Sequence, residues 1–195
     1  MSQYFENDVK VRSEERKVFA QIKDTHLTFY VDNGVFSKKG LDFGTRSLLE
    51  AIDISEIKGD VLDFGCGYGP IGIYLSKITN TSIDMIDIND RSIKLALKNA
   101  SENKVNVHIF KSDIYENIDK KYDFIITNPP IRVGKEILYK ILFGAKEYLK
   151  EKGSLILVIH KDQGAKSVMK DLSSQYKVEL LSKNKGFYVI KAKLC

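Results

Sequence analysis

The chain has 195 residues, of which 43% are hydrophobic and 29% are charged, and its formal net charge is +5. This composition excludes a disordered or collagen-like chain, and no apolar run approaches the ~20 residues that a membrane-spanning helix needs. The two cysteines and three histidines are scattered along the sequence and give no sign of a disulfide framework or a metal site. The positive charge fits either a solvated lysine-rich surface or attraction to a polyanion such as RNA, and charge alone does not decide between them.

Residues 1–57 are predicted to form an extension that packs on the main body of the protein. Their first residues contain no apolar signal-peptide core, so we expect a cytoplasmic protein. Residues 26–31 alternate as an exposed strand does, residues 34–44 form a glycine-punctuated loop, and residues 45–53 form a short helix capped by Thr45.

Residues 58–195 alternate short apolar runs with longer amphipathic stretches, a pattern typical of α/β proteins. We expect strands at 60–64, 81–87, 105–110, 122–127 and 154–160, helices at 70–79, 90–103, 135–153 and 163–176, and closing strands at 177–182 and 187–194. Helices between strands imply right-handed crossovers, so the sequence predicts a Rossmann-like, seven-stranded, mostly parallel sheet with helices on both faces. The closing strands flank a hairpin-like turn and add one antiparallel strand near an edge.

A glycine-rich loop, DFGCGYG (63–69), follows the first core strand and leads into a helix. Open parallel sheets bind ligands beyond the carboxyl ends of their strands. Gly65, Gly67 and Gly69 allow the backbone to turn sharply and to approach a ligand closely. The loop is therefore predicted to bind a ligand.

Two ligand classes fit this loop. Residues 67–72 satisfy GxGxxG, the dinucleotide fingerprint, although Pro70 removes a backbone donor where a pyrophosphate needs one. Read from Asp63, the loop is instead an acid-x-G-x-G-x-G pattern, which resembles the first motif of the class I S-adenosylmethionine-dependent methyltransferases. Asp87 ends the second core strand about 20 residues further on, where a carboxylate accepts both ribose hydroxyls of either ligand.

The fourth core strand ends abruptly in Asn128-Pro129-Pro130, beside the point where the strand order is expected to reverse. Asn128 offers an amide oxygen, and Pro129 offers a carbonyl oxygen without an N–H, on a backbone that two proline rings stiffen. Two acceptors in one plane suit a planar amino group with two hydrogens. A purely structural turn is the other interpretation, and the glycine loop and Asp87 favour the functional one.

The segment ITNPPIRVGK (126–135) resembles the asparagine-proline-proline motif of amino-group methyltransferases, which act on adenine N6, guanine N2 or protein glutamine. From about residue 26 onward, DNGVFSKKGLDFGTRSLLEAI, VLDFGCGYGPIGIYLSK and HKDQGAKS resemble the ribosomal RNA small-subunit methyltransferase C-like family. The resemblance implies one class I methyltransferase domain over the whole chain, with S-adenosylmethionine as cofactor and guanine N2 of ribosomal RNA as acceptor. It implies ribosomal RNA or a ribosomal subunit as partner, with no membrane and no DNA.

Roles for single residues also follow from this resemblance. It places Asp63 at the cofactor's ammonium group, Cys66 with the glycines in the cofactor loop, Asp87 at the ribose, Ile88 on the adenine face, Ser112 and Asp113 near the adenine amino group, and Phe36 over the cofactor. A helix or turn cap is the other interpretation of Asp113. On the substrate side, Lys38 faces RNA and Arg132 stacks on a base or holds a phosphate. Ile131 stands where many relatives carry a stacking aromatic, a departure that leaves the exact base open.

Three alternatives stay open on the residues alone. The same geometry serves methylation of a protein glutamine or a small molecule. The GxGxxG match allows an NAD-dependent oxidoreductase, although no hydride-transfer constellation accompanies it. A non-catalytic RNA-binding module is the third alternative, and the intact Asp63, Asp87 and Asn128 argue against it.

Overall fold

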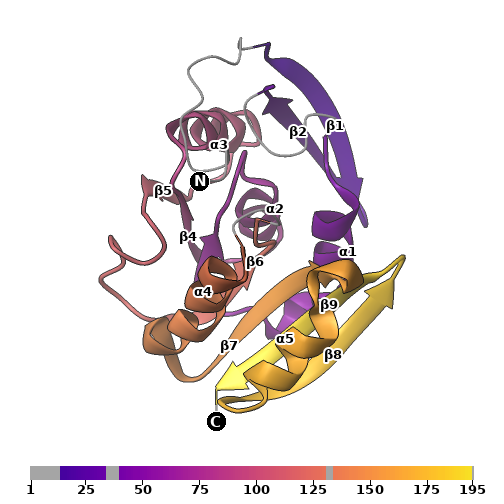
Figure 1. The fold of residues 1–195 in the computed structure, drawn as a ribbon. Helices are drawn as coiled ribbons and strands as arrows, with labels where there is room; N and C mark the ends of the chain where they lie inside the picture. Colours follow the sequence, from indigo (N-terminus) through magenta and orange to yellow (C-terminus); the bar gives the residue numbers. More distant parts are fainter. Residues whose placement is uncertain (1–13, 34–39, 131–133, 195) are drawn as a thin grey trace.

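The computed structural model describes residues 14–33, 40–130 and 134–194, and a seven-stranded sheet lies at its centre (Figure 1). The strands are β3 (Asp60–Phe64), β4 (Ser82–Asp87), β5 (His108–Lys111), β6 (Tyr122–Thr127), β7 (Leu149–His160), β8 (Tyr176–Asn184) and β9 (Phe187–Leu194). Their order is β5-β4-β3-β6-β7-β9-β8. The strands from β5 to β7 run parallel to one another, and β9 is antiparallel to both β7 and β8. This confirms the predicted Rossmann-like sheet with one antiparallel strand beside an edge.

Side chains of the sheet alternate between two hydrophobic cores, one on each face. Val61 of β3 lies in the core that α1, α2 and α3 cover, whereas Leu62 lies in the core that α4 and α5 cover. The helices are α1 (Phe43–Ala51), α2 (Pro70–Ile78), α3 (Asp90–Glu102), α4 (Gly134–Tyr148) and α5 (Ala165–Leu172), with short 3-10 turns η1 (Ile54–Glu56) and η2 (Lys161–Gln163). None of the helices in the described ranges is long and apolar enough to cross a membrane.

An N-terminal hairpin forms a second, two-stranded sheet beside α3 (Figure 1). It consists of β1 (Arg16–Ile22) and β2 (Thr25–Val31), which pair antiparallel. The strand predicted at residues 26–31 is β2. The prediction that it is exposed is wrong, because Leu27, Phe29 and Val31 are buried against the helices. The sequence analysis missed β1, since residues 18–20 are apolar in a row and hide the alternation of a strand.

Helix α4 ends at Tyr148 rather than at residue 153, and the chain enters β7 directly. Lys150 Nζ lies 2.7 Å from Asp60 Oδ2 and 2.8 Å from Asp123 Oδ2. These contacts to β3 and β6 favour an extended backbone over the helix that the local sequence predicts. The periodicity of apolar residues gives no information about such distant contacts.

Two further element ends differ from the prediction. Helix α5 is shorter than the predicted 163–176, because Gly164 has a left-handed φ of +85° that separates η2 from a helix beginning at Ala165. Strand β5 begins at His108 instead of residue 105, and its first pair with β4 is His108 with Asp84.

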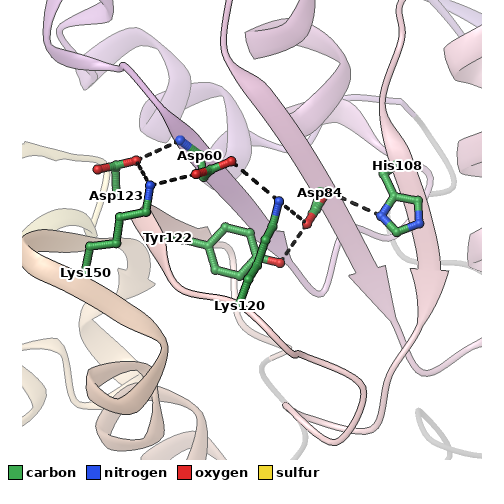
Figure 2. Close-up of polar contacts among 7 residues, drawn as sticks. All are labelled: Asp60, Asp84, His108, Lys120, Tyr122, Asp123 and Lys150. Atoms are coloured by element: carbon green, nitrogen blue, oxygen red, sulfur yellow. Dashed lines mark hydrogen bonds and ion pairs between the residues drawn. The ribbon is translucent and has the colours of Figure 1, made fainter.

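A network of charged and polar side chains joins the amino ends of the parallel strands. Figure 2 shows its members, Asp60, Asp84, His108, Lys120, Tyr122, Asp123 and Lys150. Asp84, which is only 5% exposed, accepts a hydrogen bond from the Tyr122 hydroxyl at 2.8 Å and pairs with Lys120 Nζ at 3.0 Å. The network thus ties β3 through β7 together at one edge of the sheet.

Replacing Asp84 with alanine is expected to lower the free energy of unfolding by about 1–3 kcal/mol, because the buried Tyr122 hydroxyl loses its acceptor. Urea denaturation followed by circular dichroism measures this loss. The control is Glu136→Ala, which removes an exposed ion pair with Lys140 and should cost less than about 0.5 kcal/mol. Equal losses in the two variants would show that the network contributes no more than a surface pair.

Candidate active site

A cavity lies at the carboxyl ends of β3, β4 and β6, where parallel sheets of this type bind ligands. It is lined by Asp42, Thr45, Phe64, Gly65, Cys66, Gly67, Tyr68, Pro70, Ile71, Ile86, Asp87, Ile88, Ser92, Ser112, Ile114, Asn128, Pro129, Pro130, Ile137 and Ile141. The structure therefore brings together the three segments that the sequence singled out, namely the glycine loop, the end of β4 and the Asn128 turn.

The glycine loop owes its shape to left-handed backbone positions. Gly65 and Gly67 have φ values of +69° and +57°, which other residues adopt only with strain. A Cβ added at either position meets no atom within 4 Å, so the side of the loop that faces the cavity is open. The backbone N–H of Cys66 donates to the Ile86 carbonyl at 2.8 Å, which fixes the loop to the neighbouring strand.

Asp87 connects the loop to β4. Its Oδ2 accepts the Gly67 N–H at 2.8 Å, and its Oδ1 accepts the Asn89 N–H at 2.9 Å. Burial raises the pKa of the Asp87 carboxyl, whereas the N–H groups of Asn89, Gly67 and Ile88 act to lower it. Each carboxylate oxygen has two lone pairs, so Asp87 retains acceptor capacity toward the cavity.

Asp63 lies beneath the loop and does not line the cavity. The residue is fully buried, and its Oδ2 accepts the Gly72 N–H at 2.8 Å. Its other oxygen, Oδ1, has no hydrogen-bond partner within the described part of the chain. Burial raises the pKa of Asp63 to about 7, and the nearby Asp87 carboxylate acts in the same direction. Gly69 also lies outside the lining and instead caps the start of α2.

Asn128 is held by two residues of the N-terminal extension. Its amide Nδ2 donates to Thr45 Oγ1 at 2.9 Å and to Asp42 Oδ1 at 3.3 Å. A carboxylate only accepts hydrogen bonds, so Asp42 requires the amide nitrogen on its side. Both amide hydrogens are thereby used, and the acceptor Oδ1 of Asn128 is left for a ligand.

Asp42 and Thr45 are site residues that the sequence analysis missed. The predicted cap of α1 was also wrong, because Asp42 rather than Thr45 caps this helix, with its Oδ1 accepting the Thr45 N–H at 3.0 Å. The pair lies more than eighty residues before Asn128. No local pattern in the sequence connects segments so far apart.

The turn after β5 separates two residues that were predicted to act together. Ser112 is buried and lines the cavity, whereas Asp113 is exposed and does not line it. Ser112 Oγ donates to the Ile114 carbonyl, and the Asp113 carbonyl accepts the Glu116 N–H, so a closed turn directs residue 113 outward. Ile88 lines the cavity, while Phe36, Lys38, Ile131 and Arg132 lie outside the described residues.

A second cavity adjoins the first and shares Pro129 and Pro130 with it. Its other walls come from the start of α4, the end of β7 and the turn from η2 into α5: Gly134, Lys135, Leu138, Tyr139, Ile159, Asp162, Gln163, Gly164, Ser167 and Val168. Pro129 and Pro130 therefore lie between two adjacent cavities, and Asn128 lines the first of them.

Comparisons with known proteins identify the family of the chain. The family model described as "Methyltransferase small domain" matches residues 26–191. The chain is 42% identical over 195 residues to the "Uncharacterized protein YbxB" of Bacillus subtilis (strain 168), covering 97% of each. It is 41% identical over 138 residues to the "Ribosomal RNA small subunit methyltransferase C" of Haemophilus influenzae (strain ATCC 51907), covering 68% of this chain and 42% of that protein. The chain thus spans less than half the length of that RNA methyltransferase.

Among solved structures, the fold is similar to a T. thermophilus 16S rRNA N2 methyltransferase (RsmC) in complex with AdoMet and guanosine. The TM-score is 0.83 at 24% identity, with 93% of this chain and 51% of that chain covered. A ribosomal protein L11 methylase from Lactobacillus delbrueckii gives a TM-score of 0.70 at 23% identity, with 80% of each chain covered. These structural matches confirm the class I methyltransferase fold, and the sequence match to the Haemophilus influenzae protein confirms the resemblance to the methyltransferase C-like family. Because the family match runs from the N-terminal hairpin through the glycine loop and the Asn128 turn to β9, the chain belongs to the methyltransferase small domain family.

Proposed function

We propose that this chain is an S-adenosylmethionine-dependent methyltransferase that modifies an exocyclic amino group in RNA, with guanine N2 of ribosomal RNA as the acceptor. The observation that carries the proposal is the orientation of Asn128. Its amide nitrogen is held by Thr45 and Asp42, so its oxygen is available beside the Pro129 carbonyl as an acceptor for an amine.

The residues of the first cavity fit S-adenosylmethionine better than a dinucleotide. The loop is flanked by two carboxyl groups, Asp63 and Asp87, which suit a ligand with a sulfonium and an ammonium group and oppose a diphosphate. Pro70 begins α2 and leaves the helix without a donor where a pyrophosphate needs one. Asp87 would hold the ribose hydroxyls, and Ile88 and Ile114 would supply an apolar wall for the adenine ring.

The buried carboxylate of Asp63 adds a second point of fit. Its Oδ1 has no hydrogen-bond partner within the described part of the chain, and a buried polar atom of this kind is costly unless something polar reaches it. An ammonium group at the loop, directly or through a water molecule, would supply that partner.

The chain's own residues act on the acceptor amine by alignment. When bound, the sulfonium cofactor supplies a methyl group that needs no further activation. Asn128 Oδ1 and the Pro129 carbonyl would accept the two N–H bonds of the amine and hold its nitrogen in line for attack. Positive charge develops on that nitrogen during transfer, and two fixed acceptor dipoles stabilise it. The surplus proton leaves to water after transfer, so no general base is required.

RNA is the acceptor class that the remaining features favour. The net charge of +5 favours a polyanion, and the second cavity offers space on the far side of Pro129 and Pro130. Lys135 lies on its wall and provides a cation near an incoming phosphate. An exocyclic base amine reaches such a site only when its nucleotide is flipped out or unpaired.

The experiment is a two-step assay. Calorimetric titration with S-adenosylmethionine and, in parallel, with NAD identifies the cofactor, and binding of NAD alone would overturn the proposal. Transfer of a labelled methyl group to unmodified ribosomal RNA then tests the acceptor, with nucleoside analysis expected to give N2-methylguanosine. Label in N6-methyladenosine or in ribosomal protein would reject the guanine assignment, and a flat salt response of binding would reject RNA.

A further inference from the structure

Asn99 of α3 joins two segments that are far from it in the sequence. Its amide is fully buried, and its Oδ1 accepts the Tyr30 N–H of β2 at 2.6 Å. Its Nδ2 donates to the Tyr30 carbonyl at 3.0 Å and to the Tyr68 carbonyl of the glycine loop at 2.8 Å. One amide group therefore connects the N-terminal hairpin to the loop that lines the first cavity.

Asn103, which caps the carboxyl end of α3 one turn after Asn99, makes the same contacts to β2 without the contact to the loop. Its Oδ1 accepts the Thr28 N–H at 3.1 Å, and its Nδ2 donates to the Thr28 carbonyl at 2.7 Å. The second hydrogen of this Nδ2 donates to the Asn99 carbonyl at 2.8 Å, within the helix. The two amides act like a partner strand along β2, and only Asn99 extends the arrangement to the loop.

The side chain of Tyr68 supports the same connection. Its ring lies edge-on to Phe29 of β2, with the ring centroids 5.3 Å apart and the planes at 76°. Both side chains are buried, at 2% and 0% exposure. Residue 68 is thus fixed from the hairpin side through both its backbone and its ring.

The loop is also attached to β4, on the side away from its contact with α3. Cys66 and Gly67 are held by hydrogen bonds to Ile86 and Asp87 of β4. Without Asn99, the Tyr68 carbonyl would lose the hydrogen bond that joins it to α3, while the N–H of the same peptide would keep its bond within the loop, to the Cys66 carbonyl at 2.9 Å. The positions of the Gly65 and Gly67 backbone groups, which face the cavity, depend on both attachments.

We infer that Asn99 is a positioning residue for the cofactor site: by holding the Tyr68 carbonyl it fixes the glycine loop and makes the N-terminal hairpin part of that site. The inference rests on the proposed function only where affinity for S-adenosylmethionine is measured. It assigns a function to the hairpin beyond covering the helices.

Asn103 provides a matched control. Asn99→Ala and Asn103→Ala each remove two hydrogen bonds to β2, and both should lower the melting temperature by a similar amount. The dissociation constant for S-adenosylmethionine should rise about tenfold or more in Asn99→Ala, equivalent to at least about 1.4 kcal/mol, and stay within about twofold in Asn103→Ala. Equal changes in affinity, or an unchanged affinity in Asn99→Ala, would overturn the inference.

A second pair of variants keeps the test decisive if an alanine variant does not fold. Asn99→Asp and Asn103→Asp keep the size and one acceptor but lose both donors, so only the first should weaken binding. Hydrogen exchange of the ligand-free protein supplies a readout that needs no cofactor. The Gly67 and Gly69 amides should exchange faster in Asn99→Asp than in Asn103→Asp, while the β3 amides remain protected in both.

These readouts separate the inference from the proposed function. If the wild-type protein bound no S-adenosylmethionine, the proposed cofactor would fail, and loop exchange would still decide the role of Asn99. If the wild type bound the cofactor and loop exchange were equal in both variants, the positioning role would fail and the proposed function would stand.

Discussion

Replacing Asn128 with alanine is expected to abolish methyl transfer while leaving the affinity for S-adenosylmethionine within about threefold of the wild type. The amide oxygen contacts the acceptor amine in our proposal and is not needed to hold the cofactor. Loss of one preorganised acceptor from a transition state costs about 10²–10³-fold in kcat, and loss of the alignment that it enforces adds to this. Single-turnover transfer and calorimetric titration of the same preparation measure the two quantities.

Thr45→Val is expected to reduce methyl transfer less than Asn128→Ala does. It keeps the volume of residue 45 but removes the oxygen that accepts the Asn128 Nδ2–H at 2.9 Å. The Asn128 amide should then be less well oriented, with kcat reduced by a smaller factor and cofactor affinity unchanged. Transfer that persists at the wild-type rate in Asn128→Ala would refute the amine clamp, whatever the effect of Thr45→Val.

Asp87→Ala is expected to weaken S-adenosylmethionine binding by about 100-fold or more. Two charge-assisted hydrogen bonds to the ribose would be lost, at about 1.5 kcal/mol or more each. The same carboxylate also holds the Gly67 N–H and the Asn89 N–H, so the loop loses its attachment to β4 as well. Isothermal titration calorimetry measures the change in the dissociation constant.

Asp113→Ala is the matched control for this prediction, since both acids follow strands in the sequence but only Asp87 lines the cavity. Its affinity for S-adenosylmethionine should remain within about twofold of the wild type. If both variants bound the cofactor equally well, the ribose assignment of Asp87 would be untenable. A strong effect of Asp113→Ala would mean that the turn after β5 rearranges on binding.

The features that could be predicted from the sequence are those encoded within one element or one turn. The parallel sheet follows from apolar runs of strand length separated by amphipathic helices. β3 and β6 lie side by side, which brings the Asn128 turn next to the glycine loop. The ends of these strands are local patterns of glycine, proline and acidic residues, so the sequence predicts that Asp87 and Asn128 lie at the same edge of the sheet, and both line the first cavity.

The features that could not be predicted depend on contacts between distant segments. Asp42 reads as a helix cap, and only the tertiary fold brings it to Asn128. Asp113 matches the acid expected after the third core strand, and a tight turn directs it away. Asn99 reads as an ordinary polar residue on an amphipathic helix, yet its side chain is fully buried. In each case the deciding partner is far away in the sequence.

The attachment of the hairpin has a consequence for how the protein unfolds. β1 and β2 belong to a sheet of their own, and the amides of α3 take the place of a neighbouring strand along β2. Such a unit can open locally without breaking the cooperative unit formed by the seven-stranded sheet. Opening would break the hydrogen bonds between Asn99 and Tyr30 and remove the Phe29 ring from Tyr68, so that both groups that hold residue 68 lose support. Any ligand that binds the ordered loop more tightly also suppresses the opening, by the reciprocity of linked equilibria. Protection of the hairpin should therefore report occupancy of the cavity, although no residue of β1 or β2 lines it.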